Sequence, residues 1–271
     1  LALVNTRSKP SWPFIVFNDG QVKYLDIPPG NHQSFTVGSL FGGTVPDSVG
    51  AGIIHECEGL VGLELFGQST QLAGVTTTDT LTNTLYFPHI ASNDTWWTGL
   101  VFFNPSRQDM TLAIDGFTYD GQEKGTIPYW LSPGQKLVTT WNNINPWDSP
   151  TDWLRVTSSV PITGFELFGT TNGAQLAGFT CVGLAKKAAA FAKIEKNGWT
   201  GIAFVNPTHI ANVTLTAYND AGTVIATRTF LLDALSKQVD HVADLFPGQD
   251  ISGATYVAYE ADQILVGFQL N

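Results

Sequence analysis

The fold is decided by the stretch WTGLVFFNP at residues 97–105, which returns as WTGIAFVNP at residues 199–207, a spacing of 102 residues. A second motif behaves alike: GLELFG at 62–67 recurs as GFELFG at 164–169 and as GFQL at 267–270. Self-similarity at a fixed period determines the architecture before any local pattern does. The sequence therefore predicts one unit used about three times, divided as residues 1–66 (an incomplete copy), 67–168 and 169–271.

Short strands separated by regular turns are predicted in each copy. Asn or Asp followed by Gly, directly or after one residue, recurs between apolar runs at residues 18–20, 120–121 and 219–222, and these residue types tolerate the positive φ of a hairpin turn. Strands at this spacing are typical of a sandwich or barrel. We expect an all-β chain of three tandem pseudo-repeats, each an Ig-like or jelly-roll-like β-sandwich, with a period of about 102 residues.

Two segments, 184–196 and 232–246, have helix-like composition or spacing. Their counterparts in the other copies are rich in Thr, aromatic residues and Pro. Equivalent positions share a backbone, so tertiary context outweighs a weak helix propensity. We expect both segments to be mainly extended, with at most a short helical turn in the second.

The composition excludes several classes of partner. Only 13% of the residues are charged, and the net charge of −10 opposes binding to nucleic acid or to an anionic membrane surface. No apolar run is long enough to span a bilayer. The absence of a signal peptide and of an initiator Met suggests a mature or trimmed product. An extracellular or cell-surface location is expected, with Asn93 and Asn212 as candidate glycosylation sites.

Polar residues that recur are first explained by folding. Glu64 and Glu166 occupy equivalent positions, and each is expected at a polar or edge-facing place on its strand. The five histidines are scattered, and His32, His89 and His241 align with Lys or Thr in other copies, which indicates solvated surface. We therefore expect no metal, no cofactor and no catalytic residue, and the chain is not predicted to be an enzyme. Cys57 and Cys181 are interpreted as small buried residues, with a disulfide between them or an intermolecular bond as alternatives.

Aromatic residues are concentrated in the middle copy. Trp130, Trp141 and Trp153 replace aliphatic or aromatic residues of the other copies, which indicates core or half-buried positions. Trp147 lies in a Pro-flanked insertion without an aromatic counterpart. It either packs on its own domain or stacks on a sugar or protein partner. Trp147, Trp130 and Tyr129 are the candidate binding residues.

The motif WTGxxxxNP, preceded by FPHI at residues 87–90 and closed by the Gly-Φ-Glu-Leu-Phe segment, resembles a tandem β-sandwich module of large secreted or cell-surface bacterial proteins. The resemblance covers essentially the whole chain. Copy one departs from it at Thr6, where Pro105 and Pro207 stand in the other copies. The resemblance implies an extracellular sandwich used for display or assembly, and it implies no catalytic residues.

Two functions follow as expectations. The first is an extracellular structural or adhesive protein, whose terminal strands recruit a neighbour by strand addition and build a filament end to end. The residues expected at that contact lie in the first and last strands: Leu1, Leu3, Asn5, Phe268 and Leu270. An alternative explanation of the ends is a fragment of a longer tandem array. The second function is a carbohydrate-binding accessory array of a larger secreted enzyme, with a glycan as partner.

Overall fold

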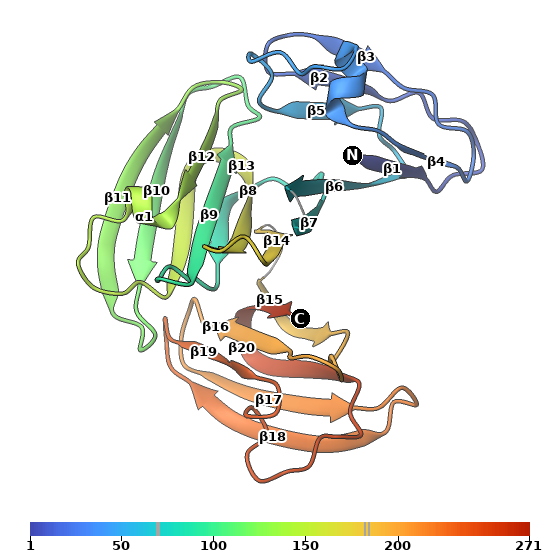
Figure 1. Ribbon diagram of the computed structural model, residues 1–271. Coiled ribbons are helices and arrows are strands. Elements are labelled where there is room, and N and C mark those ends of the chain that lie inside the picture. Colours follow the sequence, from blue (N-terminus) through green and yellow to red (C-terminus); the bar gives the residue numbers. More distant parts are fainter. Residues whose placement is uncertain (69–70, 182, 184) are drawn as a thin grey trace.

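The computed structural model describes residues 1–68, 71–181, 183 and 185–271, and it confirms an all-β chain. Strand pairing divides it into three units, here named repeat 1 (β1–β7), repeat 2 (β8–β14) and repeat 3 (β15–β20). The repeats follow one another along an open arc, and both ends of the chain lie toward its concave side (Figure 1). Within the described residues, no helix is long and apolar enough to cross a membrane.

Repeat 1 consists of two sheets. One sheet has the order β4-β1-β6-β7 and the other the order β3-β2-β5. The strands are β1 (Ala2–Asn5), β2 (Phe14–Phe17), β3 (Val22–Tyr24), β4 (His32–Ser34), β5 (Gly52–His55), β6 (Leu60–Gln68) and β7 (Gln71–Thr76), with a 3-10 helix η1 (Val37–Phe41) before β5. We call the sheet that holds the Asn-ending strand the motif sheet and the other one the hairpin sheet.

Repeat 2 has the same plan, but its hairpin sheet has four strands where that of repeat 1 has three. The long strand β13 serves both sheets, since its first half pairs with β10 and β8, and its second half pairs with β9 and β14. The elements are β8 (Thr82–Phe87), β9 (Trp96–Phe103), β10 (Met110–Phe117), β11 (Glu123–Leu131), β12 (Lys136–Thr140), α1 (Trp141–Ile144), β13 (Trp153–Thr170) and β14 (Leu176–Thr180). Each sheet of repeat 2 therefore has four strands.

Repeat 3 repeats this topology around the long strand β20, except that among the described residues no strand takes the place of β14. Its strands are β15 (Ala185–Phe191), β16 (Gly201–Val205), β17 (Ala211–Tyr218), β18 (Val224–Leu232), β19 (Lys237–His241) and β20 (Tyr256–Leu270). Even the irregularities recur, because the hairpin β10–β11 has a register shift between Gly116 and Phe117 and β17–β18 has one between Ala217 and Tyr218.

The connector between repeats is shared by the two units that it joins. Its first strand extends the motif sheet of the preceding repeat, as β7 does beside β6 and β14 beside β13. Its second strand joins the hairpin sheet of the following repeat, as β8 does beside β13 and β15 beside β20. Both β7 and β14 lie beyond the divisions expected at 66/67 and 168/169, so strand pairing places each junction inside the connector.

The two segments with helix-like composition are extended, as expected. Residues 185–191 form β15, and residues 237–241 form β19 between turns. Leu184 lies outside the described residues. The Ala- and Lys-rich segment is a strand because its backbone N–H and C=O groups pair with those of β20. This tertiary pairing outweighs the weak helix propensity of the segment.

The Asn that ends the WTGxxxxNP motif is a buried structural residue in every repeat. Asn5, Asn104 and Asn206 are all 0% exposed. In repeat 2 its Nδ2 donates to the carbonyls of Gln108, Leu131 and Ser132, at 2.8–3.2 Å. The corresponding amides of the other two repeats make the same set of bonds to their own turns. One side chain thus ties two loops to the end of the strand, which explains its recurrence without a ligand.

The tryptophan of the motif covers glycines. A Cβ built on Gly169 would lie 2.2 Å from the Trp97 ring, and one built on Gly99 would lie 3.0 Å from it. The glycine that closes the second motif is therefore required by the tryptophan that opens the first. The contact belongs to repeat 2, since a Cβ on the corresponding Gly67 of repeat 1 would meet Gln71 and Leu72 instead.

The cores confirm two of the aromatic predictions and correct one. Trp141 and Trp153 are buried at 2% and 0% exposure. Trp130, expected to be core or half-buried, is 60% exposed, and its counterpart Leu231 is 67% exposed. The expectation was wrong because an apolar residue at the same position in two copies shows only that the positions correspond, and it does not show that they are buried. Both positions lie on the outer face of a peripheral strand.

Candidate functional site

A cleft of about 1130 Å³ lies at the junction of repeats 2 and 3. One wall comes from repeat 2, from the segment between β8 and β9 and from the insertion after α1. The other wall comes from β16, β19 and the end of β20 in repeat 3. Its lining is rich in aromatic rings and in side-chain amides and carboxylates, among them Trp96, Trp147, Trp199, Asn142, Asp240 and His241.

The aromatic rings of the cleft are held in place by their own repeats. Trp199 is 38% exposed and stacks on His241, with ring centroids 5.9 Å apart and planes 21° apart. Trp147 is half-buried, and its ring centroid lies 5.9 Å from that of Trp141. Its ring also covers Gly116, where an added Cβ would lie only 2.4 Å from it. Both tryptophans therefore present one part of the ring to the cleft and anchor the other part in the protein.

Lys237 crosses the junction and is 2% exposed. Its ammonium lies 2.7 Å from the carbonyl of Asp152 and 2.6 Å from Nδ1 of His89, both in repeat 2. Burial lowers the pKa of Lys237 to about 7, and burial together with the nearby lysine lowers the pKa of His89 to about 3. The imidazole is thus neutral near pH 7, and its Nδ1 is free to accept the hydrogen bond from Lys237.

Glu166 lies in the same buried region and is 0% exposed. Neither carboxyl oxygen has a hydrogen-bond partner among the described residues. Burial raises its pKa well above the usual range, although the charge of Lys237 acts in the opposite direction. The environment therefore favours the protonated, neutral carboxyl.

These positions correct two expectations. Glu166 is not at a polar edge, and positions that exchange His with Lys are not all solvated surface, since Lys237 is buried and His89 is half-buried at the junction. The alternation of polar and apolar residues along a strand, and the exchange of His with Lys between copies, report only on the surface of an isolated repeat. They do not reveal that the end of one repeat is covered by the next.

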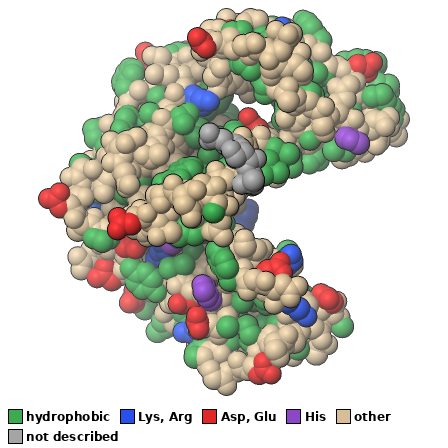
Figure 2. All heavy atoms as spheres, in the orientation of Figure 1, with side chains coloured by type: hydrophobic (Ala, Val, Ile, Leu, Met, Phe, Trp, Pro, Cys, Tyr) green, Lys and Arg blue, Asp and Glu red, His purple; other side chains and the backbone are tan. Residues whose placement is uncertain are grey.

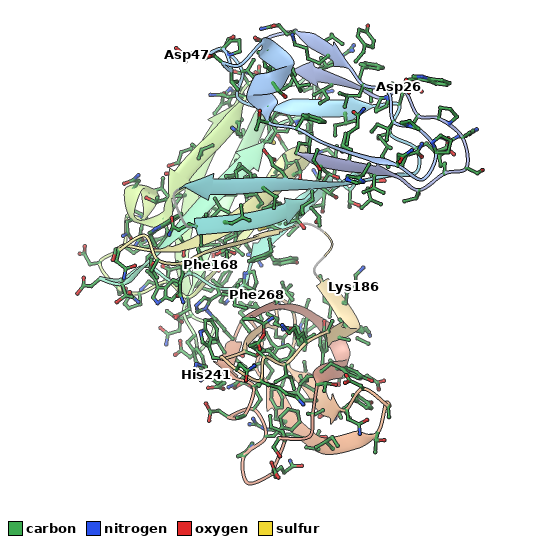
Figure 3. The ribbon with its side chains drawn as sticks, turned by 45° about the vertical axis from the view of Figure 1, so that its right-hand side comes forward. Asp26, Asp47, Phe168, Lys186, His241 and Phe268 are labelled. Atoms are coloured by element: carbon green, nitrogen blue, oxygen red, sulfur yellow. The ribbon has the colours of Figure 1, made fainter. Side chains whose placement is uncertain are left out.

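Apolar side chains also span the junction. Phe268 of repeat 3 stacks on Phe168 and Phe179 of repeat 2, with centroids 5.8 and 4.8 Å apart. A second cluster joins Phe117 and Trp153 of repeat 2 to residues of β16 and β20. Figure 3 places Phe168, Phe268 and His241 together at this boundary.

A turn of repeat 3 is adapted to this interface. Leu235 has φ 59°, in the left-handed region, where repeats 1 and 2 have Gly30 and Gly134. A non-glycine residue there is strained. Its side chain packs on the cluster of Phe117 and Trp153, and its carbonyl accepts a hydrogen bond from Nε1 of Trp153 at 3.0 Å. The strain is offset by contacts that only the neighbouring repeat supplies.

The junction of repeats 1 and 2 uses equivalent groups. Lys136 stands on β12 opposite Phe103, as Lys237 stands on β19 opposite Val205. Its ammonium donates to the carbonyl of Gly50 in repeat 1, and its charge acts on Glu64, whose pKa is raised by burial. Each internal junction therefore brings a Lys of the following repeat toward a Glu of the preceding one.

The candidate binding residues named from the sequence are not brought together. Trp147 lines the cleft, whereas Trp130 and Tyr129 lie on β11 outside it. The sequence missed Trp199 and His241. The signal that could have found them is that Trp199 opens a motif strand whose end meets the preceding repeat.

The two terminal strands differ in whether they offer a free edge. Leu1 precedes β1, which contains Leu3 and Asn5 and pairs with β4 on one side and β6 on the other, so this strand offers no free edge. The expectation was wrong there because the motif strand lies in the middle of its sheet. Phe268 and Leu270 pair with β16 on one side, and among the described residues no strand pairs with their other side; Phe268 is also used in the junction.

The two candidate glycosylation sites lie at the surface. Asn93 is exposed in a turn and Asn212 is exposed on β17. The interpretation of both cysteines as buried holds for Cys181 and is wrong for Cys57, which is exposed, and the two are not bonded to each other. Within the part of the chain that the structure describes, no three His, Cys, Asp or Glu side chains lie close enough together to hold a metal ion.

Comparison with known proteins assigns no family. No protein-family model matches the chain, and no curated protein matches it in sequence. A Thermotoga maritima protein is 13% identical over 36% of this chain and 89% of its own, with a TM-score of 0.32. A Parabacteroides distasonis protein thought to be secreted is 6% identical over 76% of this chain and 80% of its own, with a TM-score of 0.21. A structure from infectious bursal disease virus gives a TM-score of 0.18 at 7% identity over 99% of this chain and 65% of its own.

None of these TM-scores reaches 0.5, so the similarities support no inference about function. The strand pairing itself defines the class: an all-β protein of β-sandwich units joined in tandem.

Proposed function

We propose that this chain is an extracellular structural protein, in which three β-sandwich repeats form a stiff arc for adhesion or for end-to-end assembly at a cell surface. The observation that carries the proposal is the junction of repeats 2 and 3. It combines two apolar clusters, a buried lysine bonded across the boundary and a strained Leu235 that packs on the neighbour.

Such a junction supports a mechanical role and not a flexible tether. Independent domains joined by linkers move relative to one another unless their interface is large and hydrophobic. Charged side chains are few and scattered on the visible face, which leaves uncharged surface between them for repeated contacts (Figure 2).

The test is the state of the purified chain over a range of concentrations. Light scattering should show growth with concentration, and electron microscopy should show arcs joined end to end. Particles that stay monomeric at every concentration, with no attachment to cell-wall or host-matrix preparations, would contradict the proposal.

A second candidate is glycan binding in the cleft between repeats 2 and 3. The observation that favours it is the set of partly exposed rings beside amide and carboxylate groups, since sugars stack on aromatic faces and hydrogen-bond to such groups. Isothermal titration with oligosaccharides tests it. Trp199→Ala should abolish binding, whereas Trp130→Ala, an exposed tryptophan outside the cleft, should leave it unchanged. Equal effects of the two variants would exclude the cleft as the site.

A further inference from the structure

The cleft between repeats 2 and 3 has carboxylates on both walls. Among the described residues that line it, no Lys, Arg or Glu occurs, and the charged side chains are all aspartates: Asp148 and Asp152 from repeat 2, and Asp240 and Asp244 from repeat 3. A cleft lined by charge of one sign concentrates ligands of the opposite sign and repels those of its own. Anionic sugars are therefore disfavoured here, and a cationic ligand is favoured.

Two lysines lie behind the repeat 2 wall and partly offset its charge. The ammonium of Lys124 donates to Oγ of Ser149, and that of Lys237 donates to the backbone carbonyl of Asp152. Because Ser149 and Asp152 both belong to the repeat 2 wall, the carboxylates of that wall have cations nearby.

The repeat 3 wall keeps its negative charge. Asp240 on β19 and Asp244 in the turn after it take part in no ion pair within the part of the chain that the structure describes. Asp244 is exposed and Asp240 is partly exposed. Since β16 lies between β19 and β20, both carboxylates belong to the edge of the sheet that is remote from the last strand of the chain. They are therefore available to a ligand in the cleft.

Aromatic rings stand beside these carboxylates. Trp199 is 38% exposed and stacks on His241, which Figure 3 places at the boundary of the two repeats. Trp96 and Trp147 line the opposite wall. The face of an indole ring attracts a protonated amine, and it also packs against the apolar face of a sugar ring. A ligand that presents both groups fits this lining better than a neutral sugar does.

Two hydroxyl groups of the repeat 2 wall lack a hydrogen-bond partner. Thr151 lines the cleft and is 6% exposed, and its Oγ1 is unpartnered among the described residues, as is Oγ of Ser92. A buried hydroxyl without a partner costs free energy that a ligand hydroxyl recovers. The cleft volume of about 1130 Å³ also exceeds the roughly 300–1,000 Å³ of a pocket for one small molecule, so it has room for several linked rings.

We propose that this cleft binds an oligosaccharide of amino sugars. Its protonated amines pair with Asp240 and Asp244, its rings stack on Trp199, and its hydroxyls reach Thr151. This inference rests on the second candidate function, glycan binding in the cleft, and names the class of glycan. A polyamine has the charge without the ring faces and hydroxyls, so the aromatic lining and the unpartnered hydroxyls favour the sugar.

Isothermal titration with three probes separates the charge from the ring. The probes are the hexamer of glucosamine, the hexamer of N-acetylglucosamine and spermidine, at about pH 6, where Asp is ionised. The glucosamine hexamer should bind about 10-fold more tightly than the uncharged N-acetyl hexamer, and more tightly than spermidine. Equal binding of the two hexamers would refute the role of charge, and equal binding of spermidine would refute the choice of a sugar.

The carboxylates are tested by the double variant Asp240→Asn, Asp244→Asn, which keeps the shape of both side chains and removes their charge. It should weaken binding of the glucosamine hexamer about 10-fold and leave the N-acetyl hexamer unchanged. The control Asp220→Asn, at an exposed aspartate in the turn between β17 and β18, should change neither. An equal loss for both hexamers, or no loss for either, would overturn the proposal.

Failure of this inference is distinguishable from failure of glycan binding itself. A neutral oligosaccharide that binds in the cleft when the glucosamine hexamer does not would contradict the inference and leave the second candidate function standing. Absence of binding by every oligosaccharide would contradict both.

Discussion

Phe268→Ala should uncouple repeat 3 from repeat 2. The side chain is 9% exposed and its ring stacks on two phenylalanines of the neighbouring repeat. Truncating a buried Phe costs about 3–5 kcal/mol. Each aromatic pair accounts for about 0.5–1.5 kcal/mol of that, so roughly 1–3 kcal/mol should be lost from the junction itself.

Hydrogen exchange measured on peptides of each repeat separates a loss of stability within repeat 3 from a loss of coupling across the junction. In the variant, amides of repeat 3 should exchange while those of repeat 2 remain protected, whereas in the parent chain peptides on both sides of the junction should be protected together. Leu231→Ala, at a 67% exposed position of the same repeat, is the control and should change stability by less than about 0.5 kcal/mol. A Phe268→Ala variant that loses less than about 1 kcal/mol, with unchanged protection of repeat 3, would refute the coupling argument.

Further predictions concern buried polar groups and thiols. Asn206→Ala should lower the free energy of unfolding, measured by chemical denaturation, by about 2–4 kcal/mol because three carbonyls lose their donor. The control Asn212→Ala, at an exposed position, should change it by less than about 0.5 kcal/mol. The folded pKa of Lys237, about 7, lies below its ordinary value of 10.5, so the unfolded chain binds more protons in that window. Stability relative to Lys237→Met should therefore rise by about 2 kcal/mol between pH 7 and pH 9, and a flat difference would contradict the burial argument. Ellman's reagent should label Cys57 rapidly in the native chain and Cys181 only on unfolding, because burial raises the pKa of the Cys181 thiol; equal rates would contradict this difference.

The sequence predicted what depends on a single repeat. The period, the strand content and the extended state of residues 185–191 followed from recurring motifs and from the fact that equivalent positions share a backbone. The buried Trp141 and Trp153 were found in the same way. Each of these properties is decided within one copy and is therefore visible in the alignment of copies.

The sequence did not predict what depends on two repeats together. Glu166 and Lys237 have the pattern of surface groups because each looks polar in its own copy, although the next repeat covers them. The sharing of the connector between adjacent sheets was hidden for the same reason. The cleft escaped notice because Trp147 and Trp199 come from different repeats and meet only when the junction forms.

The central claim, that the repeats form one stiff arc, is tested most directly by a distance distribution across the whole chain. Spin labels on cysteines at Trp12 in repeat 1 and Asn212 in repeat 3, both exposed positions, would be measured in a Cys57→Ser background. The account predicts one narrow distribution that is unchanged by viscosity or by dilution. A broad or multimodal distribution would show repeats that move independently and would contradict the account.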